Sequence, residues 1–170
     1  MKKMLTLALI CCLVLSAAGC GGGGEDSSEG AVKDTLVWVQ NADVTSLDPH
    51  IGKETPAVTV TCQIFDTLLT MNEDNEPSPL LAESYEQIDE RTWKFKLRED
   101  VTFHDGEPMT AEDVVFSLNR ARNSNYVSYV VDAISEVTAE DDYTVVIKTA
   151  EPYAPLLASL TVPFTAIVPQ

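Results

Sequence analysis

Residues 80–121 carry the strongest local patterns in the chain and read LLAESYEQIDERTWKFKLREDVTFHDGEPMTAEDVVFSLNRA. In residues 92–98, TWKFKLR, apolar and basic side chains alternate, and this period of two predicts a strand with one buried face. Residues 104–106, HDG, predict a turn, because glycine adopts backbone angles that other residues avoid. Residues 110–113, TAED, then predict a helix start with a threonine cap and an acid three positions later.

The helix predicted after Thr110 has an apolar stripe that is expected to be buried. Val114, Leu118 and Ala121 share one helical face. Val115 and Arg122 lie at the edges of that stripe. Further elements are expected on both sides: strands at 36–39, 134–138 and 143–149, a turn at 72–79, and short helices around 80–84 and 156–160.

One more helix is predicted to begin at Thr55, which can cap it, with Pro56 at the first helical position. Four apolar residues would form its buried face: Val58, Cys62, Phe65 and Leu69. Short strands interrupted by helices, without regular βαβ alternation, indicate the α+β class.

Composition excludes several functions. The 170 residues carry 27 acids against 11 bases, a formal charge of −16. Such a chain repels phosphate backbones, so nucleic-acid binding is not expected. With 45% hydrophobic residues, 8 Gly and 9 Pro, the chain has the composition of a folded domain.

The N-terminus has the order of an export signal. A basic start at 1–3 precedes an apolar run at 4–15 and then small residues. The run is shorter than the ~20 residues that span a bilayer. We expect residues 1–19 to be a signal peptide, with a buried N-terminal helix as the alternative. Residues 17–20, AAGC, resemble the bacterial lipobox, which implies acylation of Cys20.

Residues 20–34 are Gly-rich and then acidic, which predicts a flexible leash. After cleavage and acylation, Cys62 would be the one remaining free thiol. No internal disulfide or cysteine metal site is then expected. Cys62 is predicted to be a buried structural thiol, and a reactive thiol is the alternative.

Residues that could support catalysis are few. His50 and His104 each lie within two positions of an Asp, but neither has a second His or Cys nearby. No nucleophile elbow or phosphate-binding loop occurs in the ordered part. We therefore expect no catalytic residues, no metal and no cofactor. An exported hydrolase that relies on these two histidines is the remaining enzymatic alternative.

Residues 80–121 resemble the signature of the family 5 extracellular solute-binding proteins, which serve ABC importers of oligopeptides, dipeptides and nickel. Tyr85 stands where that family usually has Trp. The similarity covers nearly all of residues 35–170. It is carried by Leu81-Ala82-Glu83, by residues 93–98, 103–106 and 110–117, and outside them by residues 46–50, 65–69 and 142–145.

This resemblance implies a two-lobed clamp of the type 2 periplasmic-binding-protein fold. Residues 35–49 would begin the first lobe and residues 50–170 would form its inserted domain, with the second lobe missing from a truncated chain. Glu54, Thr55 and Tyr126 match positions that reach the solute cleft. The simpler alternatives are that Thr55 only caps its helix and that Tyr126 packs on the helix before it.

The sequence therefore predicts a lipid-anchored solute receptor on the extracytoplasmic face of the cell membrane. Its expected partners are a short peptide, or a related solute such as a nickel complex, and the permease subunits of an ABC importer. The alternative from another class is a stand-alone cell-surface lipoprotein module that binds a partner protein.

Overall fold

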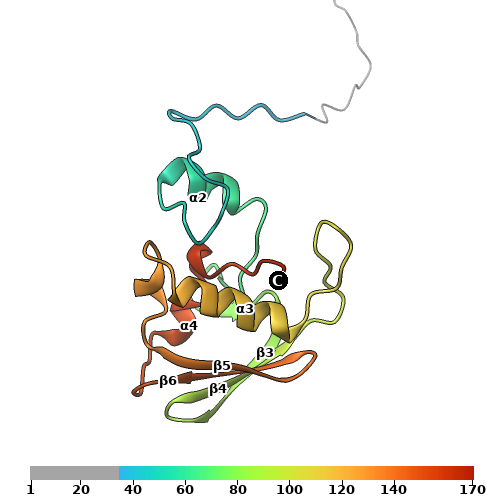
Figure 1. Ribbon diagram of the computed structural model, residues 1–170, viewed down its shortest axis with the longest axis vertical. Coiled ribbons are helices and arrows are strands. Elements are labelled where there is room, and N and C mark those ends of the chain that lie inside the picture. Colours follow the sequence, from blue (N-terminus) through green and yellow to red (C-terminus); the bar gives the residue numbers. More distant parts are fainter. Residues whose placement is uncertain (1–34) are drawn as a thin grey trace, which may run out of the picture. The chain divides into compact units, whose positions relative to one another are not determined.

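The computed structural model describes residues 35–170 (Figure 1). The predicted signal peptide at 1–19, the acylated Cys20 and the leash up to residue 34 lie outside the described residues. Val39–Gln170 form one compact unit, to which all the elements below belong.

An antiparallel sheet of four strands, in the order β3-β4-β6-β5, forms the main layer of the described region. Its strands are β3 (Ala82–Asp89), β4 (Thr92–Leu97), β5 (Ile134–Asp141) and β6 (Thr144–Thr149). A smaller antiparallel pair joins β1 (Leu69–Met71) to β2 (Pro77–Pro79). The strands predicted at 92–98, 134–138 and 143–149 are thus confirmed.

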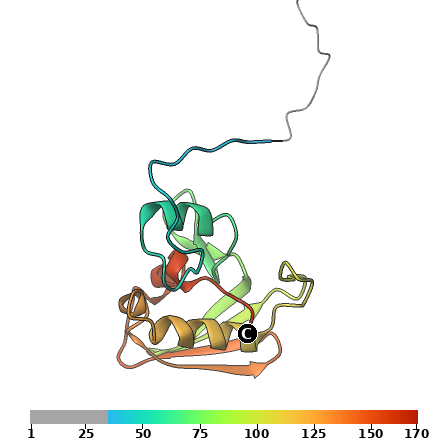
Figure 2. The ribbon, with the colours of Figure 1, turned by 45° about the horizontal axis from the view of Figure 1, so that its top comes forward.

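Helix α3 (Ala111–Arg122) lies across one face of this sheet in both ribbon views (Figures 1 and 2). The shorter helices are α2 (Thr55–Thr61), α4 (Leu156–Ser159) and the 3₁₀ turns η2 (Ser128–Val130) and η3 (Pro163–Thr165). The segment after η3 runs back beside α3, to which it is hydrogen bonded. No helix among residues 35–170 has both the length and the apolar character needed to cross a bilayer.

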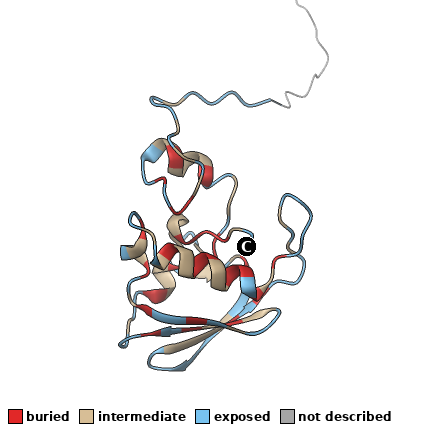
Figure 3. Cartoon of the chain, in the orientation of Figure 1, coloured by how far each residue is buried: buried red, intermediate tan, exposed pale blue. Residues whose placement is uncertain are grey.

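The core lies between α3 and the sheet. Phe95 at the centre of β4 is fully buried, and its register neighbours are Tyr85 and Val145. Val114 and Leu118 of α3 are also fully buried, as the predicted stripe requires. Buried residues recur along α3 in Figure 3, which agrees with a helix that is apolar on its sheet-facing side.

The two predicted signals that precede α3, the turn at residues 104–106 and the cap at Thr110, are confirmed. Thr110 and Asp113 form a capping box, in which the Asp113 carboxylate accepts the Thr110 backbone N–H at 2.9 Å. Gly106 has a φ of +93°, a left-handed angle that a side chain disfavours. A turn at residues 104–106 and a helix start at Thr110 were therefore both predictable from local chemistry.

The strand predicted at 36–39 is not present. These residues have no regular secondary structure, and Leu36 and Trp38 are 85% and 64% exposed. A strand is stable only when its N–H and C=O groups pair with a neighbouring strand. No strand among residues 35–170 pairs with this segment.

The helix predicted from Thr55 is shorter than expected. It ends at Thr61, and Cys62 is exposed, so the prediction of a buried thiol was wrong. Leu69 lies in β1 and not on the helix. The β-branched residues of TPAVTVT lose side-chain freedom in a helix, which favours an early end.

The prediction of a short helix around residues 80–84 was also wrong, because Ala82–Asp89 form strand β3. A helix of five residues gains few hydrogen bonds, whereas pairing with β4 satisfies the backbone of the whole segment. The turn predicted at 72–79 ends in β2, so it closes a small hairpin. The short helix predicted at 156–160 corresponds to α4.

Candidate functional site

The three predicted contact residues lie on two neighbouring segments, with Glu54 and Thr55 at the start of α2 and Tyr126 in the turn after α3. The Lys53 ammonium lies 5.8 Å from the centre of the Tyr126 ring, a distance at which a cation is attracted to an aromatic face. Lys53 precedes α2, and Tyr126 lies in the turn after α3. Tyr126 is 47% exposed, so nearly half of its surface remains open to a solute. Tyr126 is not among the residues of the hydrophobic core cluster or those packed against it.

Glu54 presents an exposed carboxylate beside this pair of loops. Its Oε2 accepts a hydrogen bond from the Thr45 hydroxyl at 3.0 Å. Its own backbone N–H, followed by the Thr45 hydroxyl, lowers the pKa of Glu54 below the usual value. The group is therefore ionised at neutral pH and can accept a hydrogen bond from a cationic or N–H-bearing solute.

Thr55 is exposed at the first turn of α2. The residue that precedes the helix is Glu54, and no side chain makes a capping hydrogen bond there. The simpler alternative, that Thr55 only caps the helix, is therefore contradicted. The Thr55 carbonyl accepts the Thr59 hydroxyl at 2.9 Å, and Thr55 itself is exposed at the surface.

Beneath this surface lies a polar network of Asp48, His50 and Arg120. Arg120 Nη1 donates to Asp48 Oδ1 at 2.8 Å and contacts His50 Nδ1 at 2.8 Å. Its second nitrogen, Nη2, pairs with Asp48 Oδ2. His50 is 1% exposed, and its Nε2 lies 3.1 Å from the carbonyl oxygen of Ala166. The network thus joins the loop before α2, helix α3 and the segment after η3.

The charges of the network follow from these contacts. The hydrogen bond from Arg120 lowers the pKa of Asp48, and the same bond raises the pKa of Arg120. Burial lowers the pKa of His50, and the nearby Arg120 guanidinium lowers it further. At neutral pH the network is an Asp48–Arg120 ion pair with a neutral histidine against it.

The sequence analysis did not predict the polar stripe on one face of α3. Asp113, Ser117 and Arg120 recur at helical spacing, on a different face from the buried stripe. Asp113 accepts the Gln170 N–H at 3.1 Å, and Ser117 bonds both polar backbone groups of Val168. The spacing of these polar residues was the available signal, but it does not identify their partners.

One serine connects the network to the surface site. The Ser124 hydroxyl donates to the His50 carbonyl oxygen at 2.6 Å. The Ser124 Oγ in turn accepts the backbone N–H of Tyr126 at 3.1 Å. The position of Tyr126 is therefore tied to His50 through a single side chain.

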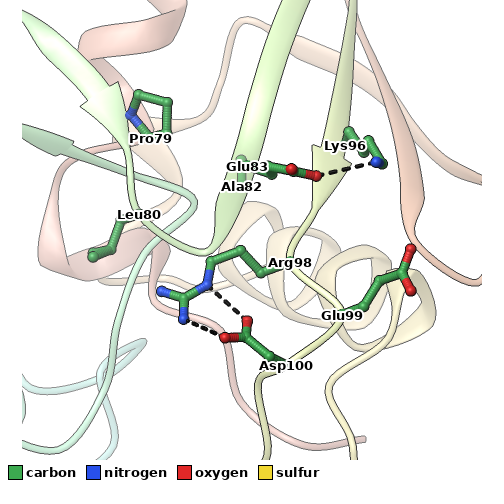
Figure 4. Close-up of a pocket in the computed structure, with 8 residues that line it drawn as sticks. All are labelled: Pro79, Leu80, Ala82, Glu83, Lys96, Arg98, Glu99 and Asp100. Atoms are coloured by element: carbon green, nitrogen blue, oxygen red, sulfur yellow. Dashed lines mark hydrogen bonds and ion pairs between the residues drawn. The ribbon is translucent and has the colours of Figure 1, made fainter.

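Other hollows are less suited to a charged solute. Figure 4 shows a groove of about 600 Å³ beside β3 and β4. Its two cations are paired with its own acids, Lys96 with Glu83 at 3.1 Å and Arg98 with Asp100 at 2.9 Å. The groove is lined by Pro79, Leu80, Ala82, Glu83, Lys96, Arg98, Glu99 and Asp100.

The second histidine lies apart from the network. His104 borders a mostly apolar cavity of about 380 Å³, together with Phe65, Phe103 and Met109. In the described part of the chain, no hydrogen bond or ion pair joins His104 to His50. The geometry thus does not assemble the two histidines that the hydrolase alternative requires. Among residues 35–170 there is also no group of three or more His, Cys, Asp or Glu side chains placed to hold a metal.

Comparison with known proteins identifies the family. The pattern of the bacterial extracellular solute-binding proteins, family 5 Middle, matches residues 76–170, more than half of the chain. The chain belongs to this family. The match includes α3, the four-stranded sheet and Tyr126, so the main layer described above is the family's own structure.

Individual relatives agree with this family membership. The periplasmic oligopeptide-binding protein OppA of Escherichia coli is 34% identical over 160 residues, which cover 82% of this chain and 30% of OppA. Listeria monocytogenes OppA bound to peptide superposes with a TM-score of 0.71 at 26% identity, over 76% of this chain and 30% of its own.

A nickel-binding relative also matches. Staphylococcus aureus NikA in complex with Ni(L-His)2 gives a TM-score of 0.57 at 31% identity, over 61% of this chain and 22% of NikA. The described residues therefore have the α+β fold of part of a two-lobed periplasmic binding protein. The chain spans less than a third of the length of each of these three family 5 proteins.

Proposed function

We propose that this family 5 protein is the solute-binding component of an ABC importer that captures short peptides, or a related solute such as a nickel complex. The observation that carries the proposal is the family match over residues 76–170. The relatives in that match are solute-binding proteins, which favours transport over both the hydrolase and the stand-alone surface module.

In this proposal residues 35–49 begin the first lobe and residues 50–170 form its inserted domain. A solute in the cleft stabilises the closed clamp, because only the closed form contacts the solute from both lobes. The closed form then delivers the solute to the permease. Glu54, Thr55 and Tyr126 would line the first-lobe side of the cleft, and their exposure on two adjoining loops supports that role.

The side chains at this surface suit a peptide. The ionised Glu54 carboxylate can accept hydrogen bonds from peptide N–H groups or from a terminal ammonium. The Tyr126 ring offers an apolar face and a hydroxyl, a combination that tolerates many side chains. These contacts bind and orient a solute but supply no nucleophile, so we propose a binding role without catalysis.

The proposed anchor predicts a specific mass. If Cys20 is acylated after cleavage, the protein extracted from its native membrane begins at residue 20 and carries diacylglycerol and a further acyl chain. Intact-mass spectrometry and N-terminal peptide mapping test this directly. Replacing Cys20 with serine should release the protein from the membrane. A chain that retains residues 1–19, or that lacks lipid at Cys20, would contradict the anchor.

The proposed contact at Tyr126 predicts a loss of affinity. We expect Tyr126→Ala to weaken solute binding about tenfold, because a well-placed aromatic contact contributes roughly 1–2 kcal/mol. Isothermal titration with the best-bound solute measures the change. Tyr129→Ala is the matched control, since Tyr129 is exposed in the same region. Equal affinities of the two variants and the unmodified protein would remove Tyr126 from the site.

A further inference from the structure

His50 is a buried histidine whose two ring nitrogens are both occupied. The guanidinium of Arg120 can only donate, so His50 Nδ1 accepts at 2.8 Å. The carbonyl of Ala166 can only accept, so His50 Nε2 carries the proton and donates at 3.1 Å. The neighbours of His50 therefore specify one neutral tautomer, with the proton on Nε2.

Protonation of the ring would break this arrangement. A proton on Nδ1 turns the acceptor into a donor that faces the Arg120 N–H, so two donors and two positive charges oppose each other. Asp48 is the nearest compensating charge, but its two oxygens already accept from Arg120. The segment after η3 presents only the carbonyl of Ala166, and the turn after α3 presents the neutral Ser124 hydroxyl.

The consequence of protonation reaches the surface. The backbone carbonyl of His50 accepts a hydrogen bond from the Ser124 hydroxyl, and the Ser124 Oγ accepts one from the backbone N–H of Tyr126. We propose that His50 is an acid-sensitive pin: its neutral form fixes Tyr126 by joining residues 46–52 to α3 and to Ala166, and its protonation releases Tyr126. This proposal depends on the proposed function only in treating Tyr126 as a solute contact.

The direction of the pH effect follows from burial. Burial, and then Arg120, lower the pKa of His50 below the 6.5 of a free histidine. The unfolded or opened form therefore takes up a proton at a higher pH than the pinned form, so the pinned form loses stability as pH falls below about 6.5. Asp48 has its own lowered pKa and contributes only at lower pH, below about 4.

The test is made without solute, on the purified chain. Nitrogen NMR of the histidine rings should show Nε2 protonated and Nδ1 unprotonated for His50 at pH 7.5, with a titration midpoint below ~6.5. Hydrogen exchange of the Tyr126 amide, after correction for its intrinsic pH dependence, should speed up by as much as about tenfold per pH unit as pH falls from ~6.5 toward that midpoint, and should level off below it. A midpoint at or above that of a free histidine, or a proton on Nδ1, would overturn the proposal.

Three variants separate a pin from a merely structural histidine. His50→Gln keeps a donor for Ala166 but cannot titrate, so the pH dependence at Tyr126 should disappear. His104→Gln is the matched control and should keep that pH dependence. Ser124→Ala should leave the His50 titration intact while uncoupling Tyr126 from it, which keeps the proposal testable if His50→Gln does not fold. An unchanged pH response at Tyr126 in Ser124→Ala would contradict the proposed connection. Failure of solute binding, by contrast, would leave all of these results unaffected.

Discussion

Replacing Phe95 with alanine lowers the free energy of unfolding by about 3–5 kcal/mol in our account. Phe95 is fully buried at the centre of β4, between register neighbours on β3 and β6. Its ring centre lies 6.0 Å from that of Tyr85, so the substitution removes an aromatic contact and leaves a cavity.

Urea unfolding followed by circular dichroism measures this change. The matched control is Lys94→Ala on the adjacent residue, whose ion pair with Glu140 lies at the surface and should contribute far less to stability. A loss below about 1.5 kcal/mol for Phe95→Ala would show that the centre of the sheet is not the core of this domain.

Replacing Arg120 with alanine has the second large effect. We expect a loss of about 2–3 kcal/mol, because the substitution leaves the Asp48 carboxylate unpaired and the buried Nδ1 of His50 without a donor. The partial exposure of Arg120 and Asp48 keeps the figure below that of a fully buried pair. Chemical denaturation at pH 7.5 gives the value.

Arg122→Ala is the control for this prediction. Arg122 belongs to the same helix, but its guanidinium bonds only the neutral Asn119 side chain and the Ser135 carbonyl. Its removal should cost less than about 1 kcal/mol. Equal losses for the two arginine variants would mean that the Asp48–His50–Arg120 network does not stabilise the loop before α2.

The sequence predicted those elements whose signal is local. Alternation in TWKFKLR specified β4, and the capping residues at Thr110 specified the start of α3. Residues 36–39 have an equally apolar pattern, but a strand also depends on a partner, and sequence periodicity cannot supply one. Cys62 was predicted to be buried because it continues the apolar helical pattern that starts at Val58. The helix ends one residue earlier, at Thr61, so Cys62 does not lie on its buried face.

The candidate site was only partly predictable. The family resemblance indicated Glu54, Thr55 and Tyr126, and their exposure on adjoining loops agrees with a surface role. The network beneath them was not predicted, since His50 and Arg120 are 70 residues apart in sequence. Only the fold brings these residues together, so the sequence alone does not show that His50 is buried against Arg120.

Titration calorimetry of the protein purified from its native membrane tests whether it is a solute receptor. The titrants are a broad pool of short peptides and, separately, a nickel–histidine complex. We expect a saturable heat of binding with the peptide pool or with the nickel–histidine complex. Cooperative unfolding of the same sample shows that the protein is folded. The absence of heat with both titrants in such a sample would contradict the assignment as a peptide or nickel receptor.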